Sequence, residues 1–136
     1  MEFVTKYWYL VAGIIVVVSL LIVGPMGRRR YGIQALSNGE AIRLINHEHA
    51  VVLDVRENDE FRAGHIRDAV HAPLGGLMAD LPRLAKHRER PIIVCCRTSN
   101  RSGRAAVMLR QQEFPTVHIL GGGMTGWESD GLPVVK

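Results

Sequence analysis

The stretch PIIVCCRTSNRSGRAA, residues 91–106, has the pattern of a strand, a loop and the start of a helix. Residues 91–95 form a short apolar run with β-branched side chains, which is typical of a strand buried on both faces of a sheet. Residues 102–114 are rich in Ala, Met, Leu, Arg and Gln, which favour a helix. A strand that passes through a short loop into a helix is the unit from which parallel sheets are built.

The rest of residues 31–136 repeats this alternation of apolar runs and helical patterns. Ser37 with Glu40 three residues later is the sequence pattern of a helix N-terminus. Further strands are expected at residues 50–55, 68–73 and 116–120, and further helices at residues 37–49, 57–66, 77–87 and after the turn at 121–127. The sequence therefore predicts an α/β fold with a small parallel β-sheet flanked by helices on both faces.

An apolar segment precedes this domain. No charged side chain occurs from Tyr7 to Gly27, and about 20 helical residues cross the roughly 30 Å hydrocarbon core of a membrane. The aromatic residues 7–9 mark one end of the segment, as interfacial anchors do, and the basic triplet Arg28–Arg30 marks the other. We predict one transmembrane anchor at residues 1–30, followed by a domain at residues 31–136.

Two other interpretations of the apolar segment are weaker. A signal peptide has its basic residues first, a shorter apolar run and an A-x-A cleavage pattern, whereas here the basic triplet follows a long run. A core helix of a soluble protein would have to bury apolar side chains on every face. The positive-inside rule places the basic flank and residues 31–136 in the cytoplasm, so we expect a single-pass protein of the inner (plasma) membrane.

The positive charge of the chain belongs to the membrane junction. Four of the 17 Lys and Arg residues, but only one of the 13 Asp and Glu residues, precede Tyr31, so the predicted domain is close to neutral. This balance argues against a nucleic-acid-binding face. A reducing cytoplasm also argues against a disulfide between the two cysteines, Cys95 and Cys96.

The loop at residues 96–101, CRTSNR, has the features of an anion cradle. Backbone N–H groups at a helix N-terminus have no partners within the helix, and the helix dipole adds partial positive charge. Cys96 at the base of this loop is expected to react as a thiolate, because helix N-termini and nearby arginines stabilise the charged form. Arg97 and Arg101 are fork-shaped donors that suit an oxyanionic substrate.

The second cysteine and the neighbouring strand end complete the expected site. Cys95 fits an inert core cysteine, since successive residues of a strand face opposite sides of the sheet. Structural zinc requires four ligands in spaced pairs, so two adjacent cysteines predict no metal site. Ligands of parallel sheets bind beyond the carboxyl ends of the strands, which is where Asp54 and Arg56 are expected, beside Cys96.

Three motifs are similar to those of the rhodanese family of sulfurtransferases. The run VVLDVRENDEFRAGHIRDAVHAPL resembles the first family signature, IIVCCRTSNRSGRAA resembles the active-site strand, loop and helix, and ILGGGMTGWESDGLPV resembles the C-terminal signature. The three motifs occur in the family's order and spacing, and the resemblance covers nearly all of residues 34–136. It implies the rhodanese fold and a sulfurtransferase activity.

By this resemblance Cys96 is the nucleophile and takes up sulfur as a persulfide. The six-residue loop would bind the substrate through Arg97, Thr98, Ser99, Asn100 and Arg101. Sulfur-transferring members have six-residue loops, whereas related phosphatases have seven residues, and the tighter ring suits a sulfane sulfur. Asp54 and Arg56 would support the loop, with an ordinary structural ion pair as the alternative. Arg101 would fix the loop geometry through the acidic neighbourhood of Asp54.

The resemblance implies a membrane-anchored enzyme that moves sulfane sulfur from thiosulfate or a persulfide donor to a thiol or cyanide, with no metal or organic cofactor. The alternative is a tethered scaffold that recruits a membrane-protein partner with little turnover. Ser99 favours the scaffold, because the family often has Gly at this position and a positive φ would strain serine. A phosphatase or arsenate reductase is the third candidate, disfavoured by loop length.

Overall fold

The computed structural model contains a five-stranded sheet with the strand order β1-β5-β4-β2-β3. It describes the backbone of residues 1–136 and the side chains of residues 1–22 and 31–136. The strands are β1 (Gln34–Leu36), β2 (Val51–Asp54), β3 (Val70–His71), β4 (Ile92–Cys95) and β5 (Val117–Leu120). All neighbouring strands run parallel, so their carboxyl ends meet at one edge of the sheet.

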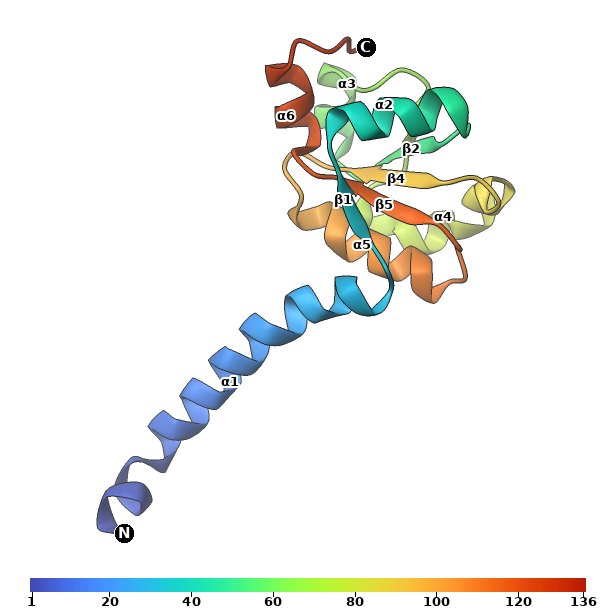
Figure 1. Cartoon of the computed structure of the whole chain (residues 1–136). Helices are drawn as coiled ribbons and strands as arrows, with labels where there is room; N and C mark the ends of the chain where they lie inside the picture. Colours follow the sequence, from blue (N-terminus) through green and yellow to red (C-terminus); the bar gives the residue numbers. More distant parts are fainter.

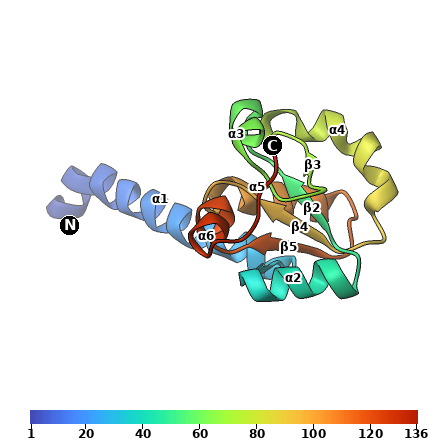
Figure 2. The ribbon, with the colours of Figure 1, turned by 90° about the horizontal axis from the view of Figure 1, so that it is seen from above.

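Helices cover both faces of this sheet, which confirms the predicted fold class. One face packs against α2 (Asn38–His47) and α6 (Gly123–Ser129), and the other against α4 (Leu77–Leu84) and α5 (Asn100–Gln111). The layers are visible in Figure 1, and Figure 2 shows α3 (Asn58–Ala63) beside β2. Two 3₁₀ turns, η1 (Leu74–Gly76) and η2 (Ala85–His87), flank α4. The three central strands β2, β4 and β5 therefore contribute side chains to two apolar cores, one on each face of the sheet.

Local signals explain most of the element boundaries. The side chain of Ser37 caps α2 by accepting a hydrogen bond from the backbone N–H of Glu40 at 3.2 Å, as predicted. Strand β1 was not predicted from the sequence. It has three residues, only Leu36 is buried, and it pairs with β5 alone at the edge of the sheet, so it carries no apolar run.

The N-terminal helix α1 (Glu2–Arg30) projects away from the domain (Figure 1). Residues Glu2–Ile22 have a mean hydropathy of 1.9, and none of this apolar window is buried. The segment is therefore long and apolar enough to cross a membrane, and it is not a core helix of the domain. Residues 23–27 and the triplet Arg28–Arg30 lie outside the described side chains.

Candidate active site

The candidate site lies where β4 ends and α5 begins. Cys95 is the last residue of β4, and Asn100 is the first residue of α5. Both cysteines are buried, and they belong to different cores: Cys96 faces the side of α4 and α5, whereas Cys95 faces the side of α2 and α6. The alternation along the strand thus separates the two thiols as predicted.

The two thiols also differ in their surroundings. Burial raises the pKa of Cys95 well above its ordinary value, and the nearby carboxylate of Asp54 raises it further, so Cys95 is held as a thiol. The Sγ atom of Cys96 lies 3.6 Å from the Oγ atom of Ser102 in the first turn of α5. The hydroxyl of Ser102 also donates a hydrogen bond to the carbonyl oxygen of Ser99 at 2.9 Å. No sequence pattern had indicated Ser102 as a neighbour of the thiol.

The loop is held from outside by the N-terminus of α6. The backbone N–H of Met124 donates to the carbonyl oxygen of Cys96 at 2.8 Å, and that of Thr125 donates to the carbonyl oxygen of Arg97 at 3.0 Å. Gly123 lies against the same carbonyl groups with a φ of 60°. A Cβ atom at Gly123 would lie 2.6 Å from the oxygen of Arg97, 2.7 Å from that of Cys96 and closer still to that of Thr98. Only glycine fits here.

The orientation of these carbonyl groups determines where the amides point. In a trans peptide the C=O and N–H bonds point in opposite directions. Because the carbonyl oxygens of residues 96–98 lie against α6, the N–H groups of residues 97–99 are directed away from α6. The N-terminus of α5 adds its partial positive charge to this ring of donors. The arrangement can stabilise a sulfur or oxygen anion.

Asp54 and Arg56 form a buried ion pair at the end of β2. The Nη2 atom of Arg56 lies 2.7 Å from Oδ2 of Asp54, and the Nε atom of Arg56 donates to the same carboxylate. Burial lowers the pKa of Arg56, but the hydrogen bond and charge of Asp54 outweigh it and raise the pKa. Nη2 also donates to the carbonyl oxygen of Gly64 at 2.7 Å. This pair ties the end of β2 to the end of α3, and its geometry is that of a structural ion pair.

Arg101 binds Glu60 of α3, and the prediction that it uses the neighbourhood of Asp54 was wrong. Its Nη1 and Nη2 atoms donate to the two carboxylate oxygens of Glu60 at 2.7 and 2.9 Å. Asp54 is not free for this role because both its oxygens accept hydrogen bonds from Arg56. The hydrogen bond from Arg101 lowers the pKa of Glu60 to about 2.

The remaining loop residues line the open side of the loop. Arg97, Thr98 and Asn100 are exposed and Ser99 is half-buried. Ser99 has a φ of −154°, so the strain that was expected if this position required a positive φ is absent. Beside the loop, a pocket of about 340 Å³ is lined by Arg56, Arg97, Met124, Thr125, Glu128 and Ser129.

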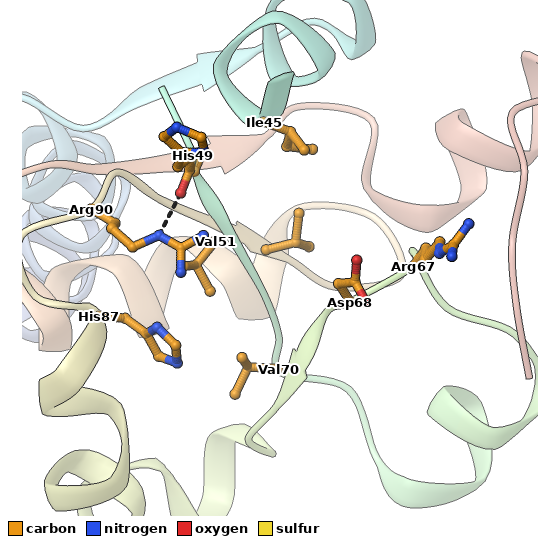
Figure 3. A pocket seen from close by; sticks show the side chains of 10 residues that line it. Ile45, His49, Val51, Arg67, Asp68, Val70, His87 and Arg90 are labelled. Carbon is orange, nitrogen blue, oxygen red and sulfur yellow. Dashed lines mark hydrogen bonds between the residues drawn. The ribbon is translucent and has the colours of Figure 1, made fainter. Parts of the chain in front are cut away.

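A larger pocket of about 390 Å³ lies at the opposite, amino-terminal edge of the sheet. Figure 3 shows Arg90 and His87 on one side of this pocket, with Asp68 across from them. The Nε atom of Arg90 donates to the carbonyl oxygen of His49 at 2.6 Å. Within the described residues, neither this pocket nor the loop contains a group of three His, Cys, Asp or Glu side chains that could hold a metal ion.

Comparisons with known proteins agree with this geometry. The rhodanese-like domain family matches residues 37–130. The uncharacterized protein YibN of Escherichia coli K12 is 31% identical over 137 residues, which cover 100% of this chain and 96% of YibN. The thiosulfate sulfurtransferase GlpE of Actinobacillus pleuropneumoniae is 32% identical over 99 residues, 73% of this chain and 90% of GlpE.

Solved structures give the same result. A rhodanese-related protein from Thermoplasma volcanium superposes with a TM-score of 0.67 and 29% identity, covering 75% of this chain and 97% of that protein. The family match covers residues 37–130, which is most of the domain that contains the sheet and the loop after β4. The chain belongs to the rhodanese-like family.

Proposed function

We propose that this protein is a membrane-anchored sulfurtransferase that carries sulfane sulfur as a persulfide on Cys96. The loop between β4 and α5 supports the proposal most directly. Its carbonyl groups face α6, so its amides point away from α6, and Cys96 also faces the side of the sheet opposite α6. The count of six residues from Cys96 to Arg101 agrees with this assignment.

In the first half-reaction the thiolate of Cys96 attacks the outer sulfur of thiosulfate. A new S–S bond forms on Cys96, the S–S bond of thiosulfate breaks, and sulfite leaves with the electron pair. The charge on the terminal sulfur is stabilised by the loop amides and the N-terminus of α5. Arg97, Thr98, Ser99 and Asn100 would bind the oxyanion end of the donor, and Arg101 would hold the loop in shape through Glu60.

In the second half-reaction an acceptor takes the terminal sulfur. A thiolate or cyanide attacks that sulfur, the S–S bond to Cys96 breaks, and the electron pair returns to the Cys96 sulfur. No redox equivalent is consumed, and no metal or organic cofactor is required for either step. Asp54 and Arg56 would support the site by fixing the end of β2 next to the loop.

Mass spectrometry of the intact protein after incubation with thiosulfate tests the proposal. We expect one added sulfur atom, located on Cys96, and its release as thiocyanate when cyanide is added. The variant Cys96→Ser should form no persulfide, since serine cannot, whereas Cys95→Ala should still form it because the side chain of Cys95 faces the other core. If the wild-type protein gains no sulfur from thiosulfate or from a persulfide donor, the better interpretation is that the domain is a scaffold that recruits a membrane protein.

We also propose that residues 1–30 anchor residues 31–136 on the cytoplasmic side of the inner (plasma) membrane. The exposed apolar face of Glu2–Ile22 and the basic residues 28–30 support this topology. Deleting residues 1–30 should move the protein from the membrane fraction to the soluble fraction with its fold intact. In sealed vesicles, digestion of the domain by a protease added from the periplasmic side would overturn the topology.

A further inference from the structure

Three aromatic rings form a stack at the carboxyl edge of the sheet. The ring of Phe61 in α3 lies between the imidazole rings of His65 and His71. The ring centroids are 3.8 Å apart on the His65 side and 4.2 Å apart on the His71 side, and the ring planes differ by only 6° and 12°. All three residues are half-buried. This group, the ring stack, joins α3 to the carboxyl end of β3.

Both imidazole rings of the stack are held by the backbone. The Nε2 atom of His71 lies 2.8 Å from the carbonyl oxygen of Arg56, and the Nδ1 atom of His65 lies 2.9 Å from that of Phe61. A carbonyl oxygen only accepts hydrogen bonds, so these ring nitrogens carry the protons. The backbone of His65 also pairs with that of Val135 through two hydrogen bonds, of 2.8 and 2.9 Å. The two outer rings are therefore fixed, and the ring of Phe61 is confined between them.

Helix α3 is too short to hold its own position. It has six residues, and none of the six is buried. Isolated helices shorter than about 12 residues are marginal in water, so α3 depends on contacts with the rest of the domain. The hydrogen bond from Arg56 to the carbonyl oxygen of Gly64 holds its end, and the ring stack holds its middle. The place of Glu60, the residue before Phe61, therefore depends on the ring stack.

Glu60 has to be placed accurately because it holds Arg101 with both of its carboxylate oxygens. The two Nη atoms of Arg101 donate to these oxygens at 2.7 and 2.9 Å. A contact of this two-pronged kind has a narrow geometry. Arg101 is the last residue of the loop that begins at Cys96. A continuous path of contacts thus runs from the ring stack through Glu60 to Arg101 and the loop.

We propose that Phe61 is a positioning residue for sulfur transfer, and that its ring sets the place of Glu60 for the ion pair with Arg101. The inference rests on the proposed sulfurtransferase function. In this role Phe61 acts through the ion pair and not through contact with the substrate. The position requires an aromatic ring rather than apolar volume alone, because only a flat side chain can stack against both imidazoles.

Transfer of sulfur from thiosulfate to cyanide by the full-length protein in detergent tests this role with two variants of the same position. Phe61→Leu keeps an apolar side chain without the flat ring, and it should lower kcat about three- to tenfold, the range for losing an aromatic pair. The KM for thiosulfate should change less than kcat, because the residues that bind the donor remain. Phe61→Tyr keeps the ring, so its kcat should stay within about twofold of the wild type.

Two further variants separate positioning from a general loss of stability. In the Arg101→Ala background, Phe61→Leu should cause no further fall in kcat, because the contact through which the ring acts is already gone. Phe114→Leu is the matched control, the same substitution at a buried aromatic residue of the core just before β5. It should lower the temperature of unfolding and leave kcat unchanged below that temperature.

The outcomes distinguish this inference from the proposed function. If the wild-type protein transfers no sulfur, the proposed function fails, and the role of Phe61 fails with it. If the wild type is active but Phe61→Leu and Phe61→Tyr have the same kcat, the ring is not required and only this inference is overturned. It is also overturned if Phe61→Leu lowers kcat by the same factor with Arg101 and without it.

Discussion

The pocket beside the loop lies at the carboxyl edge of the sheet, and the pocket lined by His87 and Arg90 lies at the amino edge. The two edges differ in how their charged side chains are paired and in which residues adopt left-handed backbone. At the carboxyl edge, two of the arginines near Cys96 are paired with carboxylates, and the one left-handed residue against the loop is Gly123. At the amino edge, His49 and Asp68 adopt left-handed backbone with φ values of 55° and 63°. The larger of these two pockets is at the amino edge, yet the sulfur transfer that we propose takes place at the carboxyl edge.

This difference indicates which structural features a preorganised site needs in this fold. At the carboxyl edge, backbone strain is avoided because the residue with the left-handed conformation is Gly123. The side chain of Arg101 is held there by its hydrogen bonds to the carboxylate of Glu60. At the amino edge, burial and the neighbouring cations Lys86 and Arg90 lower the pKa of His87, so cations there are crowded rather than paired. Strand ends and a helix N-terminus, rather than cavity size, therefore mark the reactive edge.

Among changes that leave the nucleophile Cys96 in place, the largest expected effect comes from adding one methyl group at the carboxyl edge. Gly123→Ala would push its Cβ atom into the carbonyl groups of the loop. Losing the two hydrogen bonds from α6, at about 1 kcal/mol each, and placing alanine in left-handed backbone, at about 1 kcal/mol, predicts at least a 100-fold fall in kcat/KM. Sulfur transfer from thiosulfate to cyanide measures it.

Gly131→Ala is the control for this change. Gly131 also has a positive φ, of 71°, but no atom lies within 4 Å of the position its Cβ would occupy. This variant should lose about 1 kcal/mol of stability and keep its activity. Equal losses of activity in the two variants would show that the contact between Gly123 and the loop does not matter.

The ion pair that holds the loop should matter next. We expect Arg101→Ala to lower kcat by about 10- to 100-fold, because one charge-assisted contact with Glu60 is worth about 1.5–3 kcal/mol. Glu60→Ala should have a similar effect, and the double variant should be no worse than either single variant. Additive losses in this double-mutant cycle would mean that the two residues act separately.

The same pair predicts how stability depends on pH. The folded pKa of Glu60 is about 2, below its ordinary value of 4.5. Its contribution to stability is therefore complete above about pH 4.5 and is lost as the pH falls toward 2. The free energy of unfolding should differ by about 1 kcal/mol between wild type and Glu60→Gln at neutral pH, and the difference should vanish near pH 2. A difference that is constant with pH would contradict this.

The smallest effect is expected at the amino edge. His49→Gly removes a side chain from left-handed backbone and keeps the carbonyl oxygen that accepts from Arg90. The relief of strain exceeds the entropy cost of glycine, so stability should rise by roughly 0.5–1 kcal/mol. Sulfur transfer should be unchanged. A fall in activity would show that the amino edge takes part in function after all.

The sequence alone predicted the parts of the site that depend on local patterns. The apolar run before Cys96 predicted β4, and strand alternation predicted the opposite facing of the two thiols. Capping residues predicted the start of α2. These features depend on neighbours along the chain, which periodicity and capping rules describe.

Features that depend on distant segments could not be predicted in this way. Arg101 and Glu60 are 41 residues apart, and Glu60 also accepts a hydrogen bond from the backbone N–H of Glu57, so its position alone indicates only a helix N-terminus. Gly123 looked like one glycine of a turn, although its role depends on carbonyl groups more than twenty residues earlier. Such contacts exist only once the sheet has brought α3, α6 and the loop together.

The bonds from α6 to the loop also have a consequence for biosynthesis. During synthesis α1 emerges before the loop after β4, and that loop emerges before α6, while domains fold as units. A nascent chain that has exposed Cys96 but not α6 lacks the donors that turn the loop carbonyls outward. Its thiol would therefore be an ordinary one while the apolar helix is already available to the membrane. The proposed site would therefore be assembled only after α6 has emerged and bound the loop.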